Sequence, residues 1–186
     1  MKNKKNSQMI IIAVLSFAIL FMTVGFAVYA TTLNINGTAT VGGNKWSVHY
    51  VDTTYAESAG SKVASSKTIA DTAVTYSVTL DKPGDFYEFT INVINDGSFN
   101  AKLDDITMTA LTAAQQKYLT YTLTYDGTAY TASQTGINNQ LPYASGSNTK
   151  VVKVRVEYIQ PETSSDLPEN SVDVTLTAAL DYTQAS

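Results

Sequence analysis

The chain has no cysteine and a single histidine, His49, among its 186 residues. The absence of cysteine excludes disulfides, thiol catalysis and thiolate metal sites. A zinc site usually needs several His, Cys or carboxylate ligands, and no HExxH motif is present. Because His49 falls on the polar face of its segment, we expect it to be a surface residue of a strand.

Other catalytic motifs are also missing. The chain has no GxSxG elbow, and the sole candidate base for a Ser or Thr nucleophile is His49. No glycine-rich loop lies between a strand and a helix, which gives no indication of a nucleotide site. We therefore expect no catalytic, cofactor-binding or metal-binding residues, and we expect the protein not to be an enzyme.

The acidic residues favour turns. Asp104-Asp105 interrupts the apolar register between Leu103 and Ile106, which predicts a β-bulge or turn, with metal binding there left open. Asp81 and Asp85 flank Pro83-Gly84 and are typical of turn formers. No calcium-loop spacing and no distinctive carboxylate pair accompanies them.

Basic residues are scarce after residue 30, where sixteen Asp or Glu outnumber nine Lys or Arg and leave seven net negative charges. Such a surface repels a phosphate backbone, so nucleic acid is not an expected partner.

Residues 1–30 resemble a targeting segment. Three lysines within the first five residues precede an uncharged, almost wholly apolar run of 22 residues, 9–30, that ends Val28-Tyr29-Ala30. This pattern is typical of a signal peptide cleaved after Ala30, which leaves Thr31 first in the mature chain. The run is also long enough to remain as a membrane anchor. In both cases the membrane contacts the chain only through 9–30, and the remainder is extracellular.

After residue 30, apolar and polar residues alternate with period two, which predicts strands with one buried face. Frequent Thr, Val and Tyr favour the same assignment. The segments are 33–41, 46–50, 74–80, 87–93, 106–110, 119–125, 152–158 and 172–182. Turns are expected at 81–85, 95–97 and 126–127, loops at 53–66, 131–148 and 161–170, and one short helix at about 112–118.

Eight antiparallel strands in about 150 residues predict an all-β, two-sheet jelly-roll-like sandwich, with an immunoglobulin-like sandwich as the alternative. The expected organisation is a signal peptide or anchor at 1–30, an amphipathic strand and glycine hinge at 31–43, and the sandwich at 44–186.

The segment 31–41 would be the first part of the mature chain. Leu33, Ile35, Ala39 and Val41 lie on one face, and Gly42-Gly43 follows as a flexible tether. Such a strand can complete its own sheet or the open edge of a neighbour, as donor strands do. A head-to-tail exchange that does not close produces a filament.

Two stretches carry a family resemblance: GFAVYA at 25–30 followed by TTLNI at 31–35, and PGDFYEFTINVINDG at 83–97. Together they resemble the camelysin/TasA-like secreted bacterial proteins. The resemblance implies cleavage by a dedicated signal peptidase, a jelly-roll fold and matrix fibres built by donor-strand exchange. The group is often labelled as metallopeptidases, but the sequence contains no ligand pattern for that activity.

The expected function is therefore a secreted, cell-surface or biofilm-matrix fibre subunit, whose partners are copies of itself or related subunits. Two alternatives remain. One is a monomeric surface domain that binds a glycan or protein through loops, where Tyr130 and Tyr143 are candidate contacts. The other is a secreted metallopeptidase.

Overall fold

The computed structural model describes residues 9, 12–16, 42–168 and 172–185. The chain divides into two units, residues 1–42 and 43–186, and every strand described below belongs to the second. The predicted strand at 33–41 and most of the apolar run 9–30 lie outside the described residues. None of the helical residues that are described belongs to a helix long and apolar enough to cross a bilayer.

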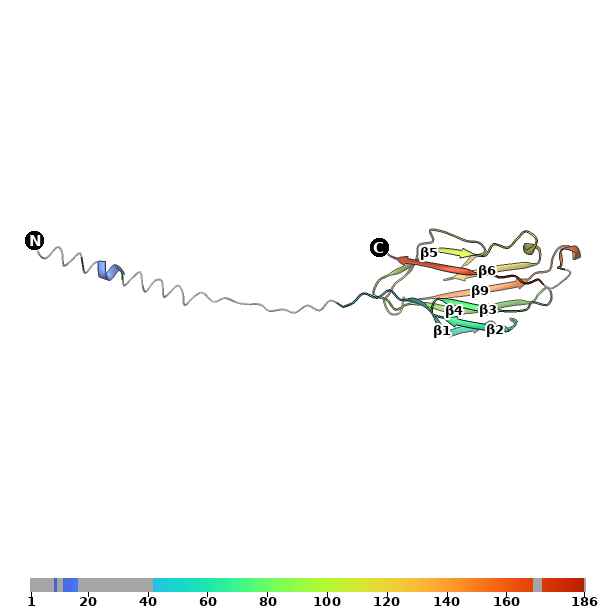
Figure 1. The fold of residues 1–186 in the computed structure, drawn as a ribbon, viewed down its shortest axis with the longest axis horizontal. Coiled ribbons are helices and arrows are strands. Elements are labelled where there is room, and N and C mark those ends of the chain that lie inside the picture. Colours follow the sequence, from blue (N-terminus) through green and yellow to red (C-terminus); the bar gives the residue numbers. More distant parts are fainter. Residues whose placement is uncertain (1–8, 10–11, 17–41, 169–171, 186) are drawn as a thin grey trace, which may run out of the picture. The chain divides into compact units, whose positions relative to one another are not determined.

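The largest sheet is antiparallel and five-stranded, in the order β1-β4-β9-β6-β7 (Figure 1). Its strands are β1 (Val48–Glu57), β4 (Phe86–Asn95), β6 (Leu119–Tyr125), β7 (Thr128–Tyr130) and β9 (Thr149–Tyr158). β4 alternates strictly between buried and half-buried residues along its length, as period two requires.

Two smaller antiparallel sheets complete the strand set. One has the order β10-β5-β8, and the other is the pair β2-β3. Their strands are β2 (Ser66–Ala70), β3 (Ala73–Ser77), β5 (Ala101–Met108), β8 (Asn139–Leu141) and β10 (Ala178–Gln184). Two short 3-10 helices, η1 (Gln115–Lys117) and η2 (Ser164–Asp166), lie in connections. The protein is thus mostly β with antiparallel sheets, as the alternation predicts.

The core is formed by the apolar faces of the five-stranded and the three-stranded sheet. Buried side chains of β4, β6 and β9 pack in one cluster with buried side chains of β5 and β8. Tyr87, Ile91, Leu103, Tyr125 and Leu141 are completely excluded from solvent. The described tyrosines on predicted inward faces are therefore mainly packing residues.

The predicted turns are confirmed. Asp85 accepts hydrogen bonds from the backbone N–H groups of Asp81 (2.9 Å) and Lys82 (3.2 Å), and Gly84 has φ of 94°. Asp126 and Gly127 both have positive φ, 49° and 82°, and join β6 to β7 as a two-residue hairpin loop. Positive φ at both positions is what a type I′ turn requires.

The bulge prediction at Asp104-Asp105 is also confirmed. Asp181 pairs with Asp105 and the next residue, Tyr182, pairs with Leu103, so Asp104 is the extra residue in β5. Its carboxylate lies 3.3 Å from Lys102 Nζ, and that of Asp105 accepts the backbone N–H of Gly136 at 3.0 Å.

Predicted loops differ more from the structure. The loop at 53–66 is wrong in its first part, because β1 continues to Glu57. The register of β1 against β4 shifts between Val51 and Ala56, which breaks the period-two pattern. In this stretch the Thr54 hydroxyl accepts a hydrogen bond from the Asn92 N–H at 2.9 Å. The loop at 131–148 contains β8, which is too short for periodicity to mark it.

Strand and helix boundaries also require correction. The segment predicted at 172–182 enters a ladder only at Ala178, because its partner β5 ends at Met108. The segment predicted at 46–50 begins at Val48, and Trp46 is 48% exposed. The expected helix is a single 3-10 turn, η1, closed by reciprocal hydrogen bonds between Thr112 and Gln115.

Candidate functional site

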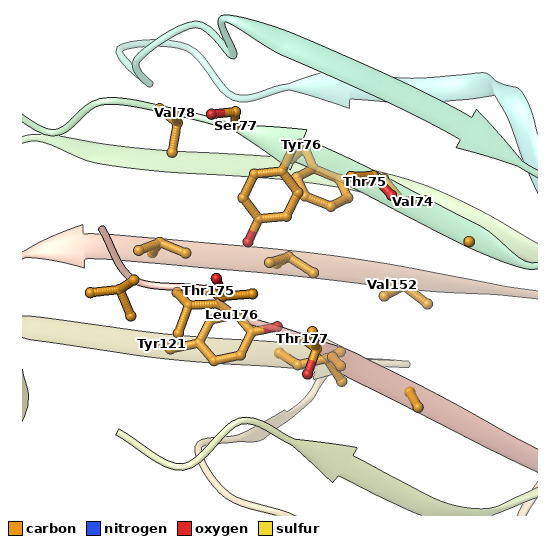
Figure 2. A pocket seen from close by; sticks show the side chains of 18 of the residues that line it. Val74, Thr75, Tyr76, Ser77, Val78, Tyr121, Val152, Thr175, Leu176 and Thr177 are labelled. Carbon is orange, nitrogen blue, oxygen red and sulfur yellow. The ribbon is translucent and has the colours of Figure 1, made fainter. Parts of the chain in front are cut away.

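The described part of the chain contains a long open groove of about 1400 Å³. One wall is β3 with the residues that follow it, 74–80, and the other is the segment 172–182 (Figure 2). The floor is the inner face of β4, β6 and β9. The groove therefore lies where a strand of the second layer would cover the five-stranded sheet.

Each wall contains one strand with an open edge, β3 in the first and β10 in the second, whereas 78–80 and 172–177 belong to no strand. β3 pairs only with β2, and β10 pairs only with β5, among the strands that the structure describes. An edge strand carries unpaired backbone N–H and C=O groups and can template another strand. The geometry thus offers two open edges to a single extended segment.

The apolar faces of the walls remain only half-buried. Val74, Tyr76, Val78 and Leu80 alternate with exposed residues along one wall, and Val174, Leu176 and Ala178 do the same along the other. Val172, at the rim, is 50% exposed. These faces have the pattern of core strands but lack a neighbour that buries them fully.

The floor is apolar and well packed. Ile91, Leu123 and Val152 of the central strands are between 0% and 2% exposed and line the groove. The floor is therefore already covered, and the apolar surface that the groove still exposes belongs to the half-buried residues of its walls.

Tyrosine side chains line the groove together with threonine, serine and aspartate side chains. In Figure 2, Tyr76 extends from β3 toward the floor of the groove, and Tyr121 of β6 lies beside Thr175 and Leu176 of the other wall. The hydroxyls of Tyr76 and Tyr182 are buried and accept or donate no hydrogen bond to the described residues. Burial raises the pKa of Tyr121 to about 12, and burial next to Tyr121 and Tyr87 raises the pKa of Tyr76 well above its usual range.

One end of the groove lies next to residues 43–47, the first residues of the second unit. Lys45 and Ser98 exchange hydrogen bonds, from Ser98 N–H to Lys45 C=O at 2.8 Å and from Lys45 N–H to Ser98 Oγ at 3.2 Å. Asp96 N–H donates to Ser47 C=O at 2.9 Å. We call residues 43–47 the root. Val48 and His49 follow the root directly and line the groove.

The root is held by Asn95 and Gly97. Asn95 is 1% exposed, donates to Phe99 C=O and Leu141 C=O, both at 2.9 Å, and accepts from Gly97 N–H at 3.0 Å. A Cβ on Gly97 would lie 2.7 Å from Lys45 O, so the close backbone approach requires glycine.

The predicted processing and donor residues lie outside the described residues: these are Ala30, Thr31, Leu33, Ile35, Ala39 and Val41. His49 is part of the polar rim, with Nε2 3.8 Å from Asp96 Oδ2. Across 42–168 and 172–185, no three His, Asp or Glu side chains gather in metal-binding geometry. Tyr130 packs against the core, whereas Tyr143 is 52% exposed.

The sequence predicts an amphipathic strand at 31–41, which lies outside the described residues, but it does not predict the groove. The alternating faces of 74–80 and 172–182 are the relevant signal, since each segment has an apolar face that is only half-buried. Alternation does not say which strands become neighbours, so it cannot reveal a gap between two of them.

No protein-family model and no curated protein matches this chain.

Proposed function

We propose that this protein is a secreted structural subunit of an extracellular fibre, and that its groove receives residues 31–41 of a neighbouring copy. The open groove between β3 and 172–182 carries the proposal. Strand addition at open sheet edges uses backbone hydrogen bonds for affinity and side-chain pockets for specificity. The role is structural, without catalysis, metal or cofactor.

The segment 31–41 has the alternating pattern that the walls of the groove also have, and it is long enough to extend along the whole of the wall 74–80. Residues 33–41 would span about 30 Å when extended, and the wall 74–80 about 23 Å. Docking would form on the order of ten backbone hydrogen bonds of about 0.5–1.5 kcal/mol each. Burial of Leu33, Ile35 and Val41 would add about 1.5–3 kcal/mol each, partly offset by ordering of the strand.

The fold that we propose is a jelly-roll-like sandwich that the incoming strand completes. The connections β3–β4, β4–β5 and β5–β6 each pass from one sheet to another. Such crossing connections are a feature of jelly rolls, in which two sheets share consecutive strands. The added strand would lie between β3 and β10 and join the two smaller sheets.

Processing and location follow from residues 1–30. In this proposal a signal peptidase cleaves after Ala30 and frees Thr31 outside the membrane. Before cleavage the run 9–30 holds the chain at the membrane and keeps the donor segment close to it. Assembly therefore begins only after export.

The direction of the inserted strand distinguishes exchange from self-insertion. β3 starts near the root, since Tyr50 N–H donates to Asp71 C=O at 2.7 Å, and its continuation ends at the Asp81–Asp85 turn. In a head-to-tail filament, the donor leaves one root and enters the far end of the next groove, so it runs parallel to β3. A segment folded into its own groove runs antiparallel to β3.

Filament formation tests the proposal. The chain 31–186 is expected to elute as large species and to form fibres in electron micrographs. Ile35→Asp places a charge on the apolar face and is expected to give a folded monomer, whereas the control Asn34→Asp, on the opposite face, is expected to assemble normally. A wild-type chain that stays a folded monomer at high concentration would overturn the proposal.

Disulfide trapping then reports the direction, because the chain has no native cysteine. With Thr75→Cys in β3, exchange predicts cross-links between chains to Thr32→Cys. Self-insertion predicts cross-links within one chain to Thr40→Cys. Reducing and non-reducing gels separate the two products by mass.

A further inference from the structure

Four of the five exposed large apolar side chains that the structure describes in the second unit lie at the two ends of its sheets. We call the end that carries the root the root end, and the opposite end, which carries the Asp81–Asp85 turn, the far end. Trp46 (48% exposed) and Tyr143 (52%) lie at the root end. Val63 (75%) and Val172 (50%) lie at the far end.

Hydrogen bonds to the turn after β4 bring the two aromatic residues to the root end. Lys45, next to Trp46, is held by its two hydrogen bonds with Ser98. Two residues further along the same turn, the side-chain oxygen of Asn100 accepts the backbone N–H of Tyr143 at 3.3 Å. Two exposed aromatic residues that are far apart in the sequence therefore belong to one surface.

The loops of this surface contain no charged residue. The segments 97–101 and 139–149, to which the turn and Tyr143 belong, have no Asp, Glu, Lys or Arg. Aromatic residues are enriched and charged residues are depleted in the cores of protein–protein interfaces. The root end therefore has the composition of an interface core, with the lysine of the root at its margin.

The far end offers a surface of matching chemistry. Val63 lies there because the N–H of the residue before it donates to the C=O of Phe86, the first residue of β4, at 2.8 Å. Val172 lies there because it precedes β10, which begins opposite the last residue of β5. Glu162 and Asp173 are exposed and give this part of the chain negative charge, opposite in sign to the lysine of the root.

We infer that the root end of one copy, through Trp46 and Tyr143, packs against the far end of the next copy along the fibre. This inference rests on the proposed function, in which a donor leaves one root and enters the far end of the next groove, which brings these two ends together. A contact between two different surfaces of identical copies repeats without closing. Tryptophan and tyrosine often supply most of the affinity of an interface, so this contact would strengthen the strand exchange.

Trp46 can report the contact directly, because it is the only tryptophan of the chain. The chain 31–186 supplies the fibre, and the same chain carrying Ile35→Asp supplies the monomer. On assembly, the emission maximum of Trp46 is expected to move to shorter wavelength, and acrylamide is expected to quench it less than in the monomer. A peptide of residues 31–43, whose binding is checked by co-elution, fills the groove of the monomer without a second copy and is expected to leave the emission unchanged.

Substitution measures how much the contact contributes. Trp46→Ser combined with Tyr143→Ser is expected to raise the lowest protein concentration that gives fibres about 10- to 100-fold, because two aromatic residues are lost from the interface. Val151→Thr is the matched control, since it removes an equally exposed apolar side chain (49%) from the outer face of β9 and is expected to assemble as the wild type does. Circular dichroism checks that both variants are folded.

The outcomes separate the two proposals. A wild-type chain that forms no fibres, or a groove that does not bind the peptide, would overturn the proposed function and this inference with it. Fibres in which Trp46 keeps the emission and quenching of the monomer would overturn the end contact and leave strand exchange standing. A full spectral shift caused by the peptide alone, or assembly of the double variant at the wild-type concentration, would do the same.

Discussion

At the residue scale, Asn95 shows how one polar side chain organises a surface of the protein. It lies at the end of β4, where the chain turns toward β5, and its amide reaches the backbone of Phe99 and Leu141. Its carbonyl oxygen holds Gly97 N–H, and the Gly97–Ser98 turn in turn holds the root at Lys45. A buried amide with all of these partners is stabilising, because each partner would otherwise lie unpaired away from water.

Asn95→Ala is expected to lower the free energy of unfolding by about 3 kcal/mol, because two buried carbonyls and one N–H lose their partner. Urea denaturation followed by tyrosine fluorescence measures this loss. Asn92→Ala, in the same strand but with no side-chain hydrogen bond in the described residues, is the matched control and is expected to cost less than about 1 kcal/mol. Equal losses in the two variants would contradict the role assigned to Asn95.

At the element scale, the β6–β7 hairpin joins local turn chemistry to a contact across strands. Asp126 and Gly127 provide the two positive φ angles, and Asp126 also lies 2.6 Å from Lys150 Nζ of β9. The hydrogen bond from Lys150 lowers the pKa of Asp126, against a smaller opposing effect of burial. Both side chains remain partly exposed, so solvent screens the pair and its contribution is modest.

The Asp126–Lys150 pair makes stability depend on pH in a defined direction. A carboxyl whose pKa is lower in the folded state stabilises above its unfolded pKa of about 3.9, and this stabilisation is lost as the pH falls through the folded pKa. Asp126→Asn, which keeps the turn conformation accessible, is expected to cost about 0.2–1 kcal/mol at pH 7.

The difference between wild type and Asp126→Asn is expected to shrink as the pH falls below about 4. Thermal unfolding at pH 7 and pH 3 measures it. Glu162→Gln, which removes an exposed carboxylate with no ion pair in the described part of the chain, is the control and should show no such pH dependence. A difference for Asp126→Asn that grows on acidification would refute the assignment.

At the scale of the whole molecule, the floor and walls of the groove and the root have different structural roles. The five-stranded sheet gives the floor, the two smaller sheets contribute to separate walls, and the root bonds to the turn that follows β4. A tension along the proposed fibre would pass from donor strand to root and into β4, because the root bonds to the turn that follows β4. The hydrogen bonds of residues Asn95–Ser98 would therefore bear tension in the proposed fibre.

Processing can be tested at this scale. Ala30→Asp is expected to block cleavage, retain the protein in the membrane fraction and abolish fibres, because signal peptidase requires a small residue before the cut. Cell fractionation with immunoblotting, followed by microscopy of the secreted material, measures this. Tyr29→Asp changes the tolerant middle position of the cleavage motif and is the control. Fibres assembled from uncut Ala30→Asp precursor would contradict the mechanism.

The sequence by itself determined the class of structure, because strands and tight turns depend on local chemistry. Period two in segments such as 119–125 and 152–158 depends only on the pleat, and it predicted β6 and β9 closely. Pro83-Gly84 and Asp126-Gly127 specify turns through their own dihedral preferences. The extra residue at Asp104 was visible for the same reason, since it breaks a local alternation.

Only the tertiary structure decided which strands became neighbours. β3 and β10 have the same alternating pattern as fully covered strands. Because they are far apart along the chain, their neighbours are determined by how the sheets pack and not by local sequence. The groove exists because β2-β3 and β10-β5-β8 lie over the same floor without pairing with one another in the described part of the chain. Sheet order is a non-local property, and the groove is its consequence.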